Sequence, residues 1–348
     1  MTVTLETALS GGHAAGLDHV RLAAALAVVV SHAWPLALGP GAAEPLSGLI
    51  GVSLGHSAVL VFFALSGVLI ARSAEARKPA AFWRARARRV LPGLAFALCV
   101  TVALAVASGA TPSAPEVAIY IARGITLVSL EHQITGAFAQ NPYAGAVNGP
   151  LWTLFYEIAC YAALALLVTL GALRRAASWV ILLATLGGAL WAIHAGMIPA
   201  EGVGLRVIKG VPLSLAFFCG AAAWRFRTHV ILNARLACAA LALATVTAWL
   251  WPNSAVADAA LAIGLGYAAL CLGLRPGAKK LNADLSYGVY LLGWPVAQSV
   301  IALCGPMSPV LLAGLSVVAV LPLAWISWHW VEAPALRKPA APLTPAGA

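Results

Sequence analysis

The chain contains few charged residues for its length. Of its 348 residues only 9% are charged and only 11 are Asp or Glu, whereas 62% are hydrophobic. Soluble domains carry roughly 25% charged and 45–50% apolar residues, so this composition excludes a water-soluble globular protein. The mean hydropathy of +0.92, with apolar stretches between short basic or Gly/Pro-rich breaks, indicates a helical membrane protein with several spans.

Cysteine is also scarce and carries no recognisable pattern. The six cysteines all lie in apolar stretches, and none forms a CxxC pair. This spacing suggests neither a disulfide framework nor a zinc site. We therefore expect no bound metal.

The apolar stretches predict an all-α transmembrane bundle of about ten spans. A polar segment, residues 1–16, precedes the transmembrane domain of residues 17–334, and a Pro/Ala-rich tail, residues 335–348, follows it. Residues 116–130 are apolar but contain Arg123, and we expect them to form an interfacial or re-entrant helix. The expected spans are residues 17–38, 48–71, 90–109, 150–170, 178–197, 207–224, 236–251, 256–274, 285–304 and 310–330.

The net charge of +10 raises the question of a nucleic-acid partner, and the placement of the charges answers it. Most Lys and Arg residues fall in alternate loops, and only Arg123, Arg206 and Lys209 fall on the other side. This bias follows the positive-inside rule and places both termini in the cytoplasm. We therefore expect a multi-pass protein of a bacterial cytoplasmic membrane with no nucleic-acid partner.

Ionisable side chains inside a membrane are costly and often functional. Glu157 is the one acidic residue well inside a predicted span, and His32 is among the deepest histidines. At 1.5 Å per residue, each lies about 10 Å from the outer end of its span, which would allow the two to meet. The alternative is that His32 caps a backbone carbonyl and Glu157 has a structural partner.

Arg21 and His32 share one face of the first predicted span. Eleven residues at 3.6 per turn bring both side chains to one side, about 16 Å apart along the axis. This geometry suits a ligand that enters from the cytoplasm with an anionic head at Arg21 and a reactive end at His32. The alternative for Arg21 is a helix-end ion pair with Asp18.

Six short motifs follow one another along the chain, and in this order they resemble the acyltransferase 3 family of integral-membrane acyltransferases. The resemblance covers residues 17–334. One position departs from it, because Gly293 stands before Trp294 where the family often has His. The motifs are Asp18 and Arg21 with His32 beyond them, residues 62–67 (FFALSG), residues 84–89 closed by Pro92, residues 152–157 (WTLFYE), residues 286–291 (SYGVYL) and residues 332–334 (EAP).

The resemblance implies transfer of an acyl group, commonly acetyl, from a cytoplasmic acyl-CoA to a hydroxyl group of a surface glycan, a lipid-linked sugar or a small metabolite. Acyl-CoA would be a co-substrate, and no cofactor would stay bound. His32 would act as the general base, and Glu157 would orient it as a triad carboxylate does. Thr153 and Tyr161 share a helix face with Glu157, and we expect them to support the site together with Asp18, Ser66 and Trp152.

Arg86 and Arg89 are the expected ligands of the CoA phosphates, together with Arg21. They match the RxxR pattern of the family, although membrane topology alone also explains a basic loop. Tyr290 is expected to line the donor passage, and Ser66 with Gly67 to support close helix packing. The alternative function is a proton-coupled transporter or glycan exporter with His32 and Glu157 as a proton relay.

Overall fold

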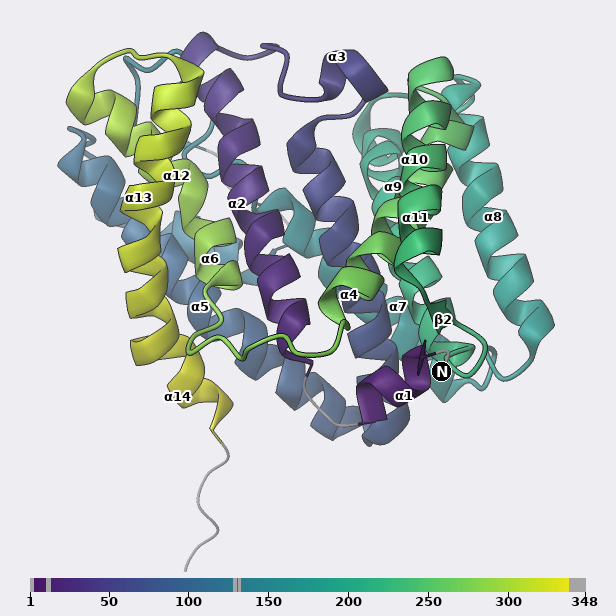
Figure 1. Ribbon diagram of the computed structural model, residues 1–348. Coiled ribbons are helices and arrows are strands. Elements are labelled where there is room, and N and C mark those ends of the chain that lie inside the picture. Colours follow the sequence, from purple (N-terminus) through teal and green to yellow (C-terminus); the bar gives the residue numbers. More distant parts are fainter. Residues whose placement is uncertain (1–2, 11–13, 128–129, 131–132, 338–348) are drawn as a thin grey trace, which may run out of the picture.

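Long apolar helices make up most of the chain (Figure 1). The computed structural model describes residues 3–10, 14–127, 130 and 133–337. Within these residues, nine helices of at least 18 residues are apolar enough to cross a membrane, and α10 has 17 residues. The membrane helices are α2 (Ala15–Leu38), α4 (Leu54–Ala76), α5 (Pro79–Ala107), α7 (Trp152–Thr169), α8 (Ala176–His194), α9 (Gly202–Arg225), α10 (Ala234–Leu250), α11 (Ala255–Gly273), α12 (Ser286–Cys304) and α13 (Pro309–Ile326).

The all-α membrane bundle expected from the sequence is confirmed. The 17 residues of α10 extend about 25 Å at 1.5 Å per residue, and α10 lies alongside α11 (Figure 1). On α8, the outward-facing Val180 and Ile181 are 67% and 66% exposed, as expected for side chains that contact lipid. The shorter elements are β1 (Val3–Thr4), α1 (Leu5–Ser10), α3 (Ser47–Ile50), α6 (Ala114–Thr126), β2 (Ile231–Leu232), the π-helical turn η1 (Ser327–Glu332) and α14 (Ala333–Leu336).

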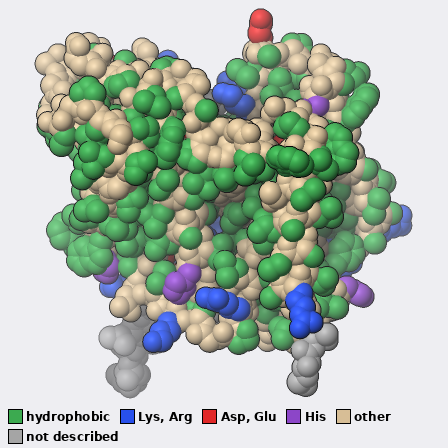
Figure 2. Space-filling view, turned by 45° about the horizontal axis from the view of Figure 1, so that its top comes forward, with side chains coloured by type: hydrophobic (Ala, Val, Ile, Leu, Met, Phe, Trp, Pro, Cys, Tyr) green, Lys and Arg blue, Asp and Glu red, His purple; other side chains and the backbone are tan. Residues whose placement is uncertain are grey.

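The start of the chain and α14 lie on one side of the bundle (Figure 1), which we call the basic face. Figure 2 shows hydrophobic side chains over the middle of the bundle and several Lys and Arg side chains near this face. The described residues of the polar N-terminal segment pack against the bundle. Leu5 and Leu9 are buried, and β1 pairs antiparallel with β2. Most of the expected tail, residues 338–348, lies outside the described residues.

The described stretch before α7, residues 133–151, enters the bundle from the face opposite the basic face. With 13 residues, α6 is too short to cross a membrane. After it, the Asn141 side chain donates to the carbonyl of Gln298 at 2.8 Å, and the Asn148 side chain donates to the carbonyl of Leu291 at 2.9 Å. Leu291 lies 13 residues before the end of α12, about 20 Å along its axis. Irregular backbone is tolerated at such depth because protein surrounds it.

The orientation of the bundle leads to a labelling prediction. Single cysteines at Arg77, Arg227 or Lys279 should resist membrane-impermeant thiol reagents in intact cells, whereas one at Pro252 should react. Arg77, Arg227 and Lys279 lie in loops between membrane helices at the basic face. Pro252 lies in the turn between α10 and α11 on the opposite face (Figure 1). The unmodified protein controls for the native cysteines. Reaction at the first three positions and protection at Pro252 would show that the basic face is extracellular.

Candidate active site

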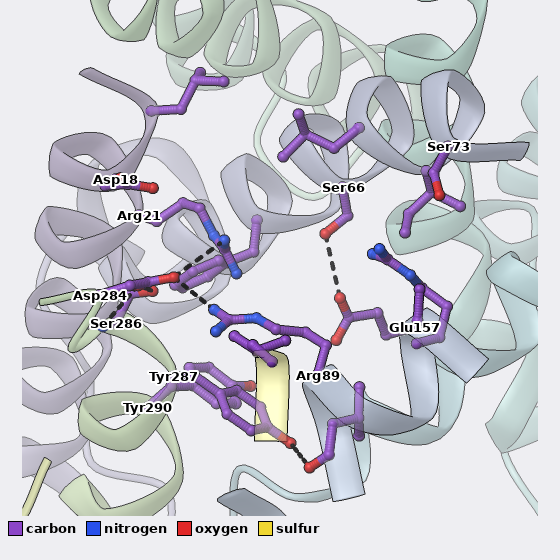
Figure 3. A pocket seen from close by; sticks show the side chains of 18 of the residues that line it. Asp18, Arg21, Ser66, Ser73, Arg89, Glu157, Asp284, Ser286, Tyr287 and Tyr290 are labelled. Atoms are coloured by element: carbon purple, nitrogen blue, oxygen red, sulfur yellow. Dashed lines mark hydrogen bonds and ion pairs between the residues drawn. The ribbon is translucent and has the colours of Figure 1, made fainter. Parts of the chain in front are cut away.

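One large cavity opens at the basic face and extends into the bundle between α2, α4, α5, α7 and α12 (Figure 3). Its volume is about 1160 Å³, which exceeds the 300–1,000 Å³ typical of sites for small ligands. At the mouth it is lined by charged side chains such as Arg77 and Lys280, and at the inner end by Val59, Phe62 and Tyr290.

Cationic side chains dominate the lining of this cavity. Among the described residues, seven Lys or Arg residues face it, against three carboxylates. A concave site with one excess charge attracts ligands of the opposite charge, so the cavity is suited to a polyanion. The cations are Arg21, Arg72, Arg77, Arg86, Arg88, Arg89 and Lys280, and the carboxylates are Asp18, Glu157 and Asp284.

Arg89 is held by the protein itself. One of its terminal nitrogens donates to Asp284 Oδ2 at 2.6 Å, and the other lies 3.6 Å from Glu332 Oε2. Its guanidinium also lies over the rings of Tyr287 and Trp328, at 5.6 and 5.9 Å from their centroids. Arg89 therefore ties α5 to the start of α12 and to η1.

Arg86, one turn before Arg89 on α5, is in a different environment. Among the described residues, its Nε atom is buried and has no hydrogen-bond partner. A buried guanidinium N–H without an acceptor is costly. Arg86 is therefore the better placed of the two predicted phosphate ligands to bind an incoming anion.

Asp284 organises the mouth of the cavity, and the sequence did not reveal it. Arg21 Nη1 lies 3.6 Å from Asp284 Oδ2, and the Ser286 hydroxyl donates to Oδ1 at 2.6 Å. Burial raises the pKa of Asp284, but Arg21 and Arg89 outweigh this and lower the pKa to about 2. The only signal in the sequence was an acidic residue two positions before the SYGVYL motif. Asp18, the other candidate partner of Arg21, lines the same cavity and is 8% exposed.

These ion pairs predict a pH-dependent loss of stability. A fall in pKa from 3.8 to about 2 corresponds to about 2 kcal/mol, so Asp284→Asn should lower the Tm in detergent by roughly 4 °C. The depressed pKa means that this contribution is present above about pH 4 and is lost as the pH falls towards 2. The Tm difference between the two proteins should therefore be constant from pH 8 to 5 and shrink below pH 4.

The matched control is Glu201→Gln at an exposed position, which should leave the Tm unchanged. An Asp284→Asn protein with the wild-type Tm at pH 7 would show that the ion pairs do not stabilise the bundle.

Glu157 lies inside the cavity with two hydroxyl partners. The Ser66 hydroxyl donates to Glu157 Oε1 at 3.2 Å (Figure 3), and the Tyr161 hydroxyl donates to the same atom. Thr153, Glu157 and Tyr161 all line the cavity from one side of α7. Ser66 was expected to serve helix packing, but that role falls to Gly67, where a Cβ would lie 1.9 Å from the carbonyl oxygen of Phe217.

The expected meeting of His32 with Glu157 does not occur. His32 is not among the residues that line the cavity, and its ring packs edge-on against Trp294 with centroids 5.0 Å apart. Thr153 contacts Tyr290, one turn before Trp294 on α12, and Glu157 follows Thr153 by another turn. Along the helix axes Glu157 is therefore offset from Trp294, the residue that His32 contacts, by about two turns, and within the described residues no hydrogen bond joins His32 and Glu157.

The depth assigned to Glu157 from the sequence was wrong for a physical reason. That count took the span to begin at the outer membrane surface near Pro150. The polar loop before α7 instead descends into the bundle, held by Asn141 and Asn148, so α7 begins well below the surface. Trp152, the first residue of α7, lies outside the cavity lining, with Lys209 Nζ 5.5 Å from its ring centroid.

Gly293 allows α2 and α12 to pack closely beside the His32–Trp294 contact. A Cβ at Gly293 would lie 2.4 Å from Val29 Cγ2. A histidine, frequent at this position in the resembled family, would require Val29 to move. Elsewhere, no group of three His, Cys, Asp or Glu residues in the described part of the chain could hold a metal ion.

Comparison with known proteins agrees with the motifs. A family model described as an acyltransferase domain (Acyl_transf_3) matches residues 14–329. The chain is 29% identical to nodulation protein 10 of Rhizobium leguminosarum bv. viciae, over 94% of this chain and 95% of that protein. It is also 29% identical to an O-acetyl transferase of Shigella phage Sf6, over 90% of this chain and 94% of that protein. No solved structure matches it. The chain therefore belongs to the acyltransferase 3 family and is a multi-pass membrane acyltransferase.

Proposed function

We propose that this protein is an O-acyltransferase that moves an acetyl group from acyl-CoA to a hydroxyl group of a glycan or another carbohydrate-like acceptor. The observation that carries the proposal is the cavity of seven cations and three carboxylates with an apolar inner end. Coenzyme A has the matching chemistry, because phosphates crowd one end of the molecule and the acyl thioester lies at the other. The phage relative named O-acetyl transferase supports a hydroxyl acceptor and an acetyl donor.

The donor would enter from the basic face, which in this proposal faces the cytoplasm of a bacterial cell, and the charge bias supports that orientation. Its phosphates would bind at the mouth, where guanidinium groups form charge-assisted hydrogen bonds. Arg86 is the principal ligand in this proposal because its Nε is free within the described residues. Arg89 would act indirectly, by holding Asp284 and Glu332 in place.

His32 is the proposed general base. A neutral imidazole can remove the proton of a hydroxyl group as its oxygen attacks the thioester carbonyl. The new C–O bond forms and the C–S bond breaks. The leaving thiolate of CoA takes up the proton from His32 and departs as the thiol. His32 contacts Trp294, one turn of α12 beyond Tyr290 at the inner end of the cavity, so it would meet the acceptor hydroxyl on the far side of Tyr290 from the donor phosphates. Glu157, offset by about two turns along the bundle, is a residue of the donor cavity rather than the partner of His32.

The same separation weakens the transporter alternative. A direct proton relay needs donor and acceptor groups within hydrogen-bond reach or joined by one water. His32 and Glu157 are offset by about two helical turns along the bundle, and within the described residues they share no hydrogen bond.

Thiol release from acetyl-CoA by the purified protein tests the proposal. With a carbohydrate acceptor such as the organism's own surface glycan, free thiol should appear together with acetylated glycan. Without acceptor, the rate of thiol release should not exceed that of the His32→Ala variant. A folded protein that moves the glycan across vesicle membranes but never cleaves the thioester would overturn the assignment in favour of a transporter.

A further inference from the structure

The inner end of the cavity is closed by a small group of packed side chains. Phe62 and Tyr290 meet edge-on there, with ring centroids 5.6 Å apart at 73°, a favourable geometry for two aromatic rings. Val59 and Leu154 lie beside them and are 8% and 3% exposed. The cavity therefore changes from a cationic mouth to an apolar end wall. We use the term end wall for Val59, Phe62, Leu154 and Tyr290.

Tyr290 is fixed in this wall by hydrogen bonds. Its hydroxyl lies 2.5 Å from Thr153 Oγ1 and donates to the carbonyl of Pro150 at 3.4 Å. Thr153 in turn donates to the same carbonyl at 3.0 Å. With these partners the Tyr290 ring is held in one orientation, and its position depends on the deep start of α7.

The next aromatic residue beyond Tyr290 on α12 is also held in place. Trp294, one turn further, donates from its indole to the carbonyl of Ala146 at 2.9 Å. A Cβ at Gly149 would lie 3.1 Å from three atoms of the Trp294 ring. Interiors packed this closely do not accept additional methylene groups without strain.

We propose that Phe62 and Tyr290 set the length of the acyl group and restrict the donor to short chains such as acetyl. This inference rests on the proposed function, because it requires the thioester end of acyl-CoA to reach the inner end of the cavity. A two-carbon acyl group would contact the Phe62 and Tyr290 rings. Each further methylene would need to displace one of them, and Tyr290 is held by Thr153 and Pro150.

The test compares acetyl-CoA, butyryl-CoA and hexanoyl-CoA as donors for the wild type, Phe62→Leu and Phe62→Ala. One methylene in a fitted pocket changes kcat/KM by roughly 10- to 200-fold. The wild type should therefore prefer acetyl-CoA over hexanoyl-CoA by at least about 10-fold, and Phe62→Ala should abolish or reverse the preference. Phe62→Leu should fall between them. Phe218→Ala, at a buried position that does not line the cavity, should leave the preference unchanged.

A binding measurement separates this inference from the proposed function. The non-reactive thioethers ethyl-CoA and hexyl-CoA are titrated into the wild type and into both Phe62 variants. The wild type should bind ethyl-CoA at least about 10-fold more tightly than hexyl-CoA, and Phe62→Ala should remove the difference. Equal binding of both thioethers by the wild type would show that the end wall does not limit the acyl chain, while the donor site would be supported. Binding of neither would overturn the donor site and the inference together.

Discussion

Replacing His32 with Ala should reduce acyl transfer by about 10²- to 10⁴-fold, the range that a general base contributes. The loss should appear in kcat with the KM for acyl-CoA little changed, because His32 lies outside the cavity that would bind the donor. The measurement is steady-state thiol release by detergent-purified protein, normalised to the folded fraction. His32→Gln keeps a polar side chain but cannot take up the proton, so it should be as inactive as His32→Ala.

His19 provides the matched control, because it lies on the same helix but is exposed at the basic face. His19→Ala should transfer acyl groups at the wild-type rate. Near-normal turnover by folded His32→Ala would remove the general-base assignment and return His32 to a packing role against Trp294.

Replacing Arg86 with Ala should raise the KM for acyl-CoA by about 10- to 100-fold, because a charge-assisted hydrogen bond contributes on the order of 1.5–3 kcal/mol. Contacts to a remote phosphate stabilise bound substrate and transition state alike, so kcat should change little. Initial rates over a range of acetyl-CoA concentrations measure both constants. Among the described residues, Arg86 Nε has no hydrogen-bond partner, which is the structural reason to expect a larger effect here than at residues whose guanidinium groups are already paired.

Arg84→Ala is the control for this prediction. Arg84 lies on the same helix, is exposed and does not line the cavity, so its loss should leave the KM unchanged. If the basic run served only membrane topology, Arg84→Ala and Arg86→Ala would both change the amount or orientation of inserted protein, and the inserted protein would show a normal KM.

The positions of the membrane helices along the chain could be predicted from the sequence, because two strong physical constraints determine its composition. A helix that crosses lipid must be apolar over about 20 residues, and the positive charges between helices mark one side of the membrane. These constraints do not depend on which helices touch. In the segment before the first span, Leu5 and Leu9 are buried by contacts that hydropathy alone does not reveal.

The candidate site could be predicted only in part. Arg21, Ser66, Arg86, Arg89, Thr153, Glu157, Tyr161 and Tyr290 do line one cavity. Which of these side chains contact one another could not be predicted, because the sequence gives the depth of a residue only relative to the apolar boundary of its span. At Glu157 that boundary is misleading, since the polar loop before α7 is itself inside the bundle. Asp284 was missed because a single acidic residue in a loop looks like any solvated charge until Arg21 and Arg89 are seen to converge on it.

The descending loop before α7 also has a consequence for biogenesis. Asn141 and Asn148 bond to Gln298 and Leu291, residues that are synthesised about 150 positions later. Until α12 has inserted, Asn141 lacks its bonds to Gln298, and Asn148 keeps only a 3.4 Å contact to Thr101 on α5. Unsatisfied amides in hydrocarbon are costly. We therefore expect the loop to remain outside the lipid hydrocarbon until the later helices have been inserted. A nascent chain that stopped before Ser286 could insert its first helices correctly and would still lack both the seated loop and the inner end of the cavity.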